Sequence, residues 1–166
     1  GVDIKGARMW KGARHALETG MNNVAFLRTR IEFIDRFFAP GEVSAIWITF
    51  PDPFEGKVTR RLMAAPFLER YRRILKPGGI VHLKTDSPDL YHFTKKVAEL
   101  YDIIIVKDYD NVYSETDVKE ELKIKTHYES LDIAQSKKIH YLKFTLPLFI
   151  KDIDEELQQL IQKNEQ

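Results

Sequence analysis

The nine residues Ala45–Pro53, which read AIWITFPDP, constrain the fold more than any other stretch of this chain. Five of the first six residues are apolar or aromatic, and the run stops at Pro51. A short apolar run that ends in proline predicts a strand over about Val43–Phe50, buried on both faces as in a parallel sheet. Asp52 then lies at the carboxyl end of this strand, which is the edge where open α/β sheets bind ligands.

The length and composition of the chain indicate a soluble globular protein. At 166 residues and 19.4 kDa, it can form one domain or most of one. No apolar run approaches the ~20 residues that a membrane helix needs, and no signal peptide opens the chain. The sequence contains no cysteine, which excludes disulfides and thiolate metal sites and fits a cytoplasmic location.

Charge is unevenly distributed along the chain, although the net charge is only +1. Between Lys57 and Lys76 there are seven basic residues and one acidic residue, Glu69, which gives a local charge of +6. Residues 151–166 instead carry a net charge of −3. The basic stretch indicates an anionic partner, most commonly nucleic acid, and the alternative interpretation is a solvated helix face.

Hydrophobic periodicity predicts strands that alternate with helices. Helices are predicted over Lys5–Glu18, Arg60–Lys76 with its main part from Pro66, Asp89–Tyr101 and 148–162, and a helical turn or loop is predicted over about 31–38. Strands are predicted over 24–27, 43–50, 80–84, 103–106 and 139–146, with turns at Pro40-Gly41 and Lys76-Pro77-Gly78-Gly79. Residues 111–117 are predicted as a loop, and 120–137 as irregular and then helical. The alternation predicts an α/β fold with a mostly parallel sheet and an antiparallel edge strand.

Three predicted strands are each followed by a carboxylate, namely Asp3, Asp52 and Asp86. If these strands are parallel, the three carboxylates gather at one edge of the sheet. The alternative is that aspartates are simply favoured in turns and at helix N-caps. An acidic residue after the second strand of a dinucleotide-type fold accepts ribose hydroxyls of an adenosine cofactor, and Asp3 has that position. The glycine-rich turn that usually accompanies it is not in this sequence.

Other chemistries find little support in the residues. The sequence has no nucleophile elbow and no phosphate-binding P-loop. Its five histidines lack the spacing of zinc ligands, so we expect no metal site. Thr126 and Glu129 have the TxxE spacing of a helix capping box.

Taken together, the motifs of this chain resemble those of the tRNA guanine-N7 methyltransferases. The similarity rests on Phe50-Pro51-Asp52-Pro53-Phe54, Arg60-Arg61-Leu62, Phe67-Leu68, Lys76-Pro77-Gly78-Gly79, Leu83-Lys84-Thr85-Asp86 and Thr126-His127-Tyr128-Glu129. Gly1-Val2-Asp3 and Asn23-Val24 fit the same frame upstream. The resemblance spans about residues 1–146, with the motifs in order and sensibly spaced.

The resemblance implies an AdoMet-dependent class I methyltransferase with a three-layer, Rossmann-like fold. The methyltransferase domain would occupy residues 1–146 and lack its N-terminal strand and glycine-rich motif, and residues 147–166 would form an amphipathic helical tail. The start at Gly1-Val2-Asp3 is typical of the end of a strand, and there is no initiator methionine. We therefore expect an upstream part of the protein. Where the family has an aspartate near the adenine, this chain has Thr29-Arg30.

The resemblance also implies roles for individual residues. It places Asp3 and Asp52 at the site of S-adenosyl-L-methionine, the expected cofactor. It assigns Lys57, Asp86, Thr126 and Glu129 to the binding of the target guanosine. Lys57 matches the lysine of the family only if a gap is placed before it.

The chemistry of this reaction suits these residue types. N7 of a neutral guanine carries an in-plane lone pair, so methyl transfer needs alignment and no general base. A carboxylate can accept the N1–H and N2–H of guanine and offset the positive charge that develops on the ring. Asp86 is the candidate for that role, and Asp52 serves the cofactor, the base or both. Arg60 and Arg61 are the candidates for contacts with tRNA phosphates.

The leading hypothesis is a tRNA guanine-N7 methyltransferase whose partner is tRNA, with no membrane and no metal. Two alternatives stay open: a class I methyltransferase with another substrate, and a non-catalytic RNA-binding partner. The sequence leaves both a monomer and a homodimer open.

Overall fold

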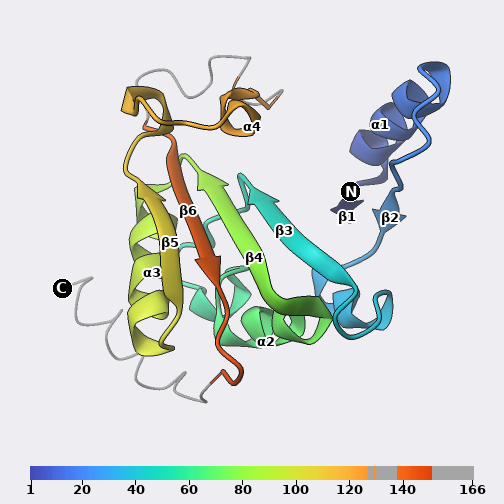
Figure 1. Ribbon diagram of the computed structural model, residues 1–166. Helices are drawn as coiled ribbons and strands as arrows, with labels where there is room; N and C mark the ends of the chain where they lie inside the picture. The colour runs from blue at the N-terminus through green and yellow to red at the C-terminus, as the bar shows by residue number, and fades with distance from the viewer. Residues whose placement is uncertain (127–128, 130–137, 151–166) are drawn as a thin grey trace. The chain divides into compact units, whose positions relative to one another are not determined.

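A computed structural model describes residues 1–126, 129 and 138–150 (Figure 1). The chain divides into two compact units, one over Gly1–Ala39 and one from Pro40 onward. Each unit is described by itself below. The domain boundary predicted at residue 146 lies next to a segment, 151–166, that is outside the described residues. It therefore stays a prediction, as does most of the helix predicted over 148–162.

The first unit contains two short parallel strands joined by a helix. It comprises β1 (Val2–Asp3), α1 (Gly6–Glu18), β2 (Leu27–Arg28) and the 3-10 helix η1 (Ile31–Arg36). The helix predicted over Lys5–Glu18 is confirmed as α1, and η1 lies within the helical turn or loop predicted over 31–38. α1 ends where Gly20 adopts a φ of 70° and the N–H of Met21 donates to the carbonyl of Ala16. The strand predicted over 24–27 begins only at Leu27, so it is displaced by three residues.

The second unit is built on a four-stranded mixed sheet. Its strands are β3 (Val43–Thr49), β4 (Leu75–Thr85), β5 (Ile104–Tyr109) and β6 (His140–Thr145), in the order β3-β4-β6-β5 (Figure 1). β3 and β4 are parallel, and β6 is antiparallel to both of its neighbours. The antiparallel strand therefore lies one position in from the edge. The chain leaves β4, passes through α3 and enters β5, which is not a neighbour of β4 in the sheet. β6 occupies the position between them.

Two amphipathic helices cover one face of this sheet. They are α2 (Ala65–Ile74) and α3 (Pro88–Leu100), which lie behind the strands in Figure 1. Pro66 lies in the first turn of α2, as predicted, and Ser87 caps α3 by accepting a hydrogen bond from the N–H of Leu90 at 3.2 Å. Shorter helical segments are η2 (Val58–Arg60), η3 (Val112–Ser114) and α4 (Glu120–Lys123). None of the helices described has the length and apolarity needed to cross a bilayer.

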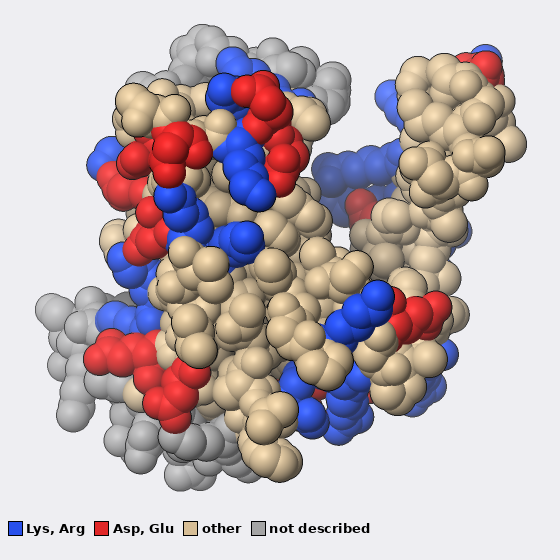
Figure 2. Space-filling model, viewed as in Figure 1, with Lys and Arg blue, Asp and Glu red and all other residues tan. Residues whose placement is uncertain are grey.

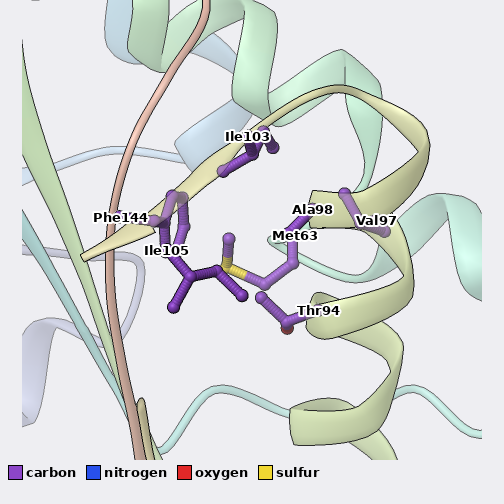
Figure 3. Close-up of a pocket in the computed structure, with 7 residues that line it drawn as sticks. All are labelled: Met63, Thr94, Val97, Ala98, Ile103, Ile105 and Phe144. Carbon is purple, nitrogen blue, oxygen red and sulfur yellow. The ribbon is translucent and has the colours of Figure 1, made fainter. Parts of the chain in front are cut away.

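The main core lies between these helices and the sheet. Side chains of α3, the start of β5 and β6 meet there around Met63, whose own exposure is 0% (Figure 3). Val97 and Phe144 are also fully or almost fully buried. This apolar layer anchors the helices to the sheet.

Two elements differ from their sequence predictions. β4 begins at Leu75, before the predicted turn, and so includes Gly78 and Gly79. This is possible because the pairing of β3 with β4 shifts register between Val43 and Ala45. Gly78 accommodates this irregularity with a φ of 72°. Residues 120–137 were expected to be irregular at first, but Glu120–Lys123 form the helical turn α4. Most of the remainder of that segment lies outside the described residues.

The opposite face of the sheet carries a row of aromatic rings. Trp47 on β3 stacks on His82 of β4 with ring centroids 3.9 Å apart, and Nδ1 of His82 lies 2.7 Å from the hydroxyl of Tyr141. Trp47 is 43% exposed, so the prediction that β3 is buried on both faces is wrong for the residues described. Figure 2 shows that the middle of this face carries few charged side chains.

The position of His82 in this row predicts a pH-dependent stability. Burial, followed by the positive charge of Lys143, lowers the pKa of His82 from 6.5 to about 4. The unfolded chain therefore binds a proton that the folded chain does not, and stability falls as the pH drops from 6.5 towards 4. The loss is at most about 3 kcal/mol. Urea unfolding between pH 4 and 7 measures it, and His82→Asn should flatten the dependence; an equally steep dependence in this variant would contradict the assignment.

Candidate active site

The FPDPF segment forms a strained turn at the carboxyl end of β3. Phe50 and Phe54 have φ values of 49° and 44°, in the left-handed region that residues other than glycine rarely adopt. The N–H of Phe50 donates to the carbonyl of Lys84 at 2.8 Å, so the turn starts from a fixed point on β4. Asp52 lies between these two positions and its side chain is exposed. The turn therefore presents a carboxylate to solvent at the strand end.

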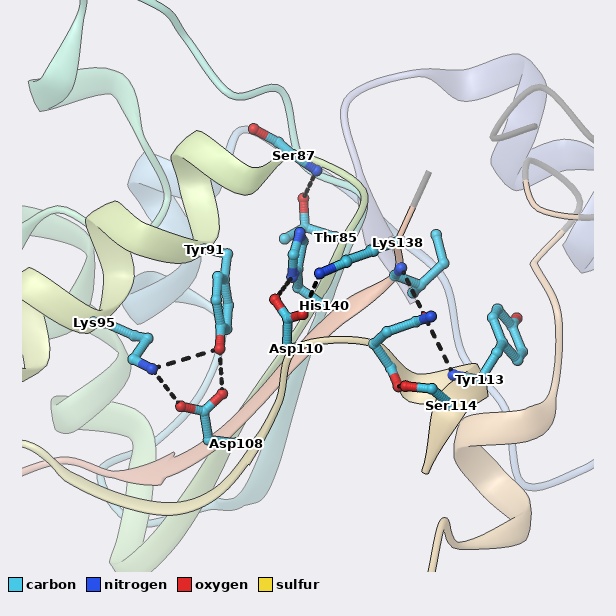
Figure 4. Close-up of polar contacts among 12 residues, drawn as sticks. Thr85, Ser87, Tyr91, Lys95, Asp108, Asp110, Tyr113, Ser114, Lys138 and His140 are labelled. Atoms are coloured by element: carbon cyan, nitrogen blue, oxygen red, sulfur yellow. Dashed lines mark hydrogen bonds and ion pairs between the residues drawn. The ribbon is translucent and has the colours of Figure 1, made fainter. Parts of the chain in front are cut away.

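The end of β4 is held in a similar way. Thr85 is buried, and its hydroxyl accepts a hydrogen bond from the N–H of Ser87 at 3.1 Å (Figure 4). Ser87 in turn caps α3. Asp86 lies between these two residues and is partly buried. Its backbone is thus fixed on both sides, immediately before a helix.

Asp52 and Asp86 share one edge of the sheet, as predicted from the sequence. β3 and β4 are parallel neighbours with Thr49 opposite Lys84. Asp52 follows the last residue of β3 by three positions, and Asp86 follows the last residue of β4 directly. Asp3 belongs to the first unit, where it is the last residue of β1 and its carboxylate accepts a hydrogen bond from the N–H of Lys5 at 2.9 Å. That Asp3 lies beside Asp52 and Asp86 stays a prediction.

A buried ion pair lies behind this edge. The ammonium of Lys84 is 2.9 Å from the carboxylate of Glu129, and the two side chains are 4% and 3% exposed. The same ammonium donates to the main-chain carbonyls of Leu122 and Ile124 at 3.1 and 3.4 Å. The ring centroids of Phe50 and Tyr113 lie 6.0 and 5.9 Å from it. Such a buried charge is stable only because it is paired and hydrogen-bonded.

Glu129 also forms the capping box predicted from its spacing with Thr126. The N–H of Thr126 donates to the carboxylate at 2.8 Å, and the N–H of Glu129 donates to the threonine hydroxyl at 3.2 Å. The hydroxyl of Tyr113 adds a third donor at 2.6 Å. Burial alone would raise the pKa of Glu129, but the hydrogen bonds from Tyr113, Lys84 and Thr126 together hold it below its usual value. Glu129 is therefore a buried, ionised carboxylate.

The two adjacent arginines of the basic stretch have different environments. Arg60 is exposed, as is Lys57. Arg61 is only 5% exposed; its Nε donates to the carbonyl of Pro53 at 2.8 Å, and its guanidinium lies 4.6 Å from the ring centroid of Phe93. The structure thus places Arg61 in the interior, supporting the FPDPF turn, and not on the surface where the sequence prediction had it meet phosphates.

A second polar cluster supports α3 near its start. Asp108 on β5 accepts hydrogen bonds from the hydroxyl of Tyr91 at 2.5 Å and from Lys95 at 2.6 Å (Figure 4). Burial and then the contact with Asp108 raise the pKa of Tyr91 to about 12, so the phenol stays protonated. These contacts fix the helix that begins just after Asp86.

Sequence reasoning missed Lys84 and Tyr113 as members of this site. A signal for Lys84 was present, because a lysine that closes an apolar strand must find a partner for its charge. Nothing near Tyr113 in the sequence indicates its contact with Glu129. No group of three or more metal-ligating side chains occurs within the parts of the chain that the structure describes.

Several solved methyltransferases superpose on this chain. A SAM-dependent methyltransferase from Aquifex aeolicus superposes with a TM-score of 0.57 at 12% identity, covering 88% of this chain and 67% of that one. An rRNA methylase from Streptococcus thermophilus gives 0.56 at 13% identity, with 88% and 72% covered. With its α/β layers and mixed sheet, the chain therefore has the Rossmann-like fold of class I methyltransferases.

Sequence comparisons define the family more narrowly. The family model described as "Putative methyltransferase" matches residues 1–142. The tRNA (guanine-N(7)-)-methyltransferase of Bacteroides thetaiotaomicron is 51% identical over 146 residues, which is 88% of this chain and 58% of that protein. The protein of the same name from Cytophaga hutchinsonii is 42% identical, with 89% and 69% covered. The chain belongs to the tRNA guanine-N7 methyltransferase family, as the motifs predicted. It spans less than two thirds of the length of the Bacteroides relative.

Proposed function

We propose that the protein containing this chain transfers a methyl group from S-adenosyl-L-methionine to N7 of a guanosine in tRNA. The observation that carries this proposal is the pair Asp52 and Asp86 at adjacent strand ends, in a chain 51% identical to a relative of that name. As a tRNA-modifying enzyme it would act in the cytoplasm.

The residues at the sheet edge fit the proposed cofactor. Ligands of open α/β sheets bind at the carboxyl ends of the strands, and the FPDPF turn exposes the Asp52 carboxylate there. We assign Asp52 to the cofactor, and the family resemblance implies the same role for Asp3. Bound S-adenosyl-L-methionine supplies an electrophilic methyl group. The fixed backbone of Phe50 keeps Asp52 in place without reorganisation.

The target guanosine would be held mainly by Asp86. Its carboxylate can accept the N1–H and N2–H of guanine, which orients N7 and offsets the charge that develops on the ring. We assign Lys57, Thr126 and Glu129 to the same guanosine, as the family resemblance implies. A guanosine within folded RNA has to be turned out of its stack to reach this edge.

The tRNA backbone would be met by exposed cations near the FPDPF turn. Arg60 and Lys57 are the exposed candidates. Arg61 is excluded from this set by its burial.

The contact of Arg60 with phosphate predicts a change in salt dependence. Arg60→Ala should weaken tRNA binding and reduce the slope of log K against log salt by about one. Filter binding of tRNA at several salt concentrations measures the slope. Glu55→Ala, which alters an exposed acidic residue of the same loop, provides a control that should not flatten it. A slope unchanged by Arg60→Ala would remove this residue from the phosphate-binding surface.

The proposed function is tested by methylation of unmodified tRNA. The full-length protein should transfer labelled methyl groups from S-adenosyl-L-methionine, and mapping of the product should find them on guanine N7. Methylation at another position would favour a class I methyltransferase with a different target. Tight tRNA binding with no transfer would favour the non-catalytic RNA-binding alternative.

A further inference from the structure

Lys84 connects three motifs that lie far apart in the sequence. Its carbonyl accepts the N–H of Phe50, which starts the FPDPF turn. Its main chain leads directly into Thr85 and Asp86. Its ammonium reaches the carboxylate of Glu129, 45 residues further along the chain.

The surroundings of the ammonium leave it little freedom. The side chain of Lys84 is 4% exposed, and its donors are directed to two carbonyls of the 122–124 segment as well as to Glu129. An exposed ion pair would contribute little to positioning because solvent screens it. A buried one with these additional contacts holds its partners in one arrangement.

We propose that Lys84 is a positioning residue for guanosine binding. By fixing the carboxylate of Glu129 and the main chain at Leu122 and Ile124, it sets the Thr126–Glu129 pair against the edge that carries Asp86. This inference rests on the proposed function, since that function assigns Thr126 and Glu129 to the guanosine. The ammonium of Lys84 is directed to Glu129 and to the main-chain carbonyls of Leu122 and Ile124, so Lys84 acts through these groups.

The first test is kinetic and uses the full-length protein. Lys84→Met should lower kcat/KM for tRNA by about ten- to a hundredfold, because misplacement of binding groups reduces productive alignment. The dissociation constant for S-adenosyl-L-methionine should change less than about twofold, since Lys84 acts on the guanosine side. Lys84→Arg, which restores the buried cation, should recover part of the activity. Lys143→Met alters a lysine paired opposite His82 on the neighbouring strand and should leave kcat/KM unchanged.

A double-variant cycle shows whether Lys84 acts through Glu129. If it does, Glu129→Gln should add less than about twofold to the loss caused by Lys84→Met. Independent, multiplicative losses would overturn the proposal. So would a folded Lys84→Met protein with normal kcat/KM and only a lower melting temperature, because that result would define a purely structural role. Should Lys84→Met fail to fold, Lys84→Met/Glu129→Leu removes both buried charges, and its kcat/KM should then match that of Glu129→Gln.

A second readout does not depend on activity. The amide proton of Thr126, which is donated to Glu129, should exchange with solvent about tenfold faster in Lys84→Met than in the wild-type protein. In Lys143→Met its exchange rate should be unchanged. Unchanged exchange in Lys84→Met would overturn the positioning role. If the wild-type protein does not methylate tRNA, the proposed function fails, and this exchange measurement still decides whether Lys84 fixes Glu129.

Discussion

Asp86→Ala is expected to lose methyl transfer while tRNA binding survives. The variant removes the acceptor for the guanine N1–H and N2–H, and kcat/KM should fall by about 10²–10³, as for loss of a preorganised group that stabilises developing charge. Affinity for tRNA should change little, because phosphate contacts elsewhere supply most of it. Single-turnover methylation and filter binding measure the two effects separately.

Two further variants make this experiment specific. Asp86→Asn keeps the size of the side chain but replaces one acceptor by a donor, so it should be impaired nearly as strongly as Asp86→Ala. Asp89→Ala alters an exposed carboxylate in the first turn of the same helix and should keep near-normal turnover. Near-normal turnover in Asp86→Ala itself would show that another group holds the base.

The second large effect is expected at Arg61. Arg61→Met removes the hydrogen bond to the carbonyl of Pro53 and the contact of the guanidinium with the ring of Phe93. It should lower the free energy of unfolding by about 3 kcal/mol, because a carbonyl behind the turn loses its donor and a desolvated cation–π contact is lost. Urea unfolding of the full-length protein measures this loss.

The neighbouring arginine provides a matched control. Arg60→Met alters an exposed residue one position away and should change stability by no more than about 0.5 kcal/mol. Arg61→Lys should recover little, since a lysine lacks the planar fork that both bonds Pro53 and stacks on Phe93. Equal stability of Arg60→Met and Arg61→Met would contradict the supporting role of Arg61.

The parts of the site that depend on local sequence could be predicted. Pro51 stops β3 whatever lies around it, and the helix that follows β4 begins at a serine and a proline with strong positional preferences. Because the two strands are parallel neighbours, these local signals were enough to bring Asp52 and Asp86 to the same edge.

The remaining features depend on contacts between distant segments. A count of charges treats Arg60 and Arg61 alike, and only the packing of Phe93 decides which one is buried. Likewise the exposure of Trp47 depends on which elements cover the sheet, and an apolar run cannot show this. The partner of Lys84 lies 45 residues away, beyond the reach of any local pattern.

The position of β6 has a consequence for the order in which the protein folds. β6 is the last in sequence of the strands described, yet it lies between β4 and β5, pairing Thr145 with Ile80 on one side and with Ile104 on the other. During synthesis, the edges of β4 and β5 that pair with β6 therefore stay unpaired until residues 140–145 have been made. Pairings of such long sequence separation form slowly, and open strand edges favour aggregation. We expect the nascent chain to be most vulnerable to misassembly just before β6 emerges.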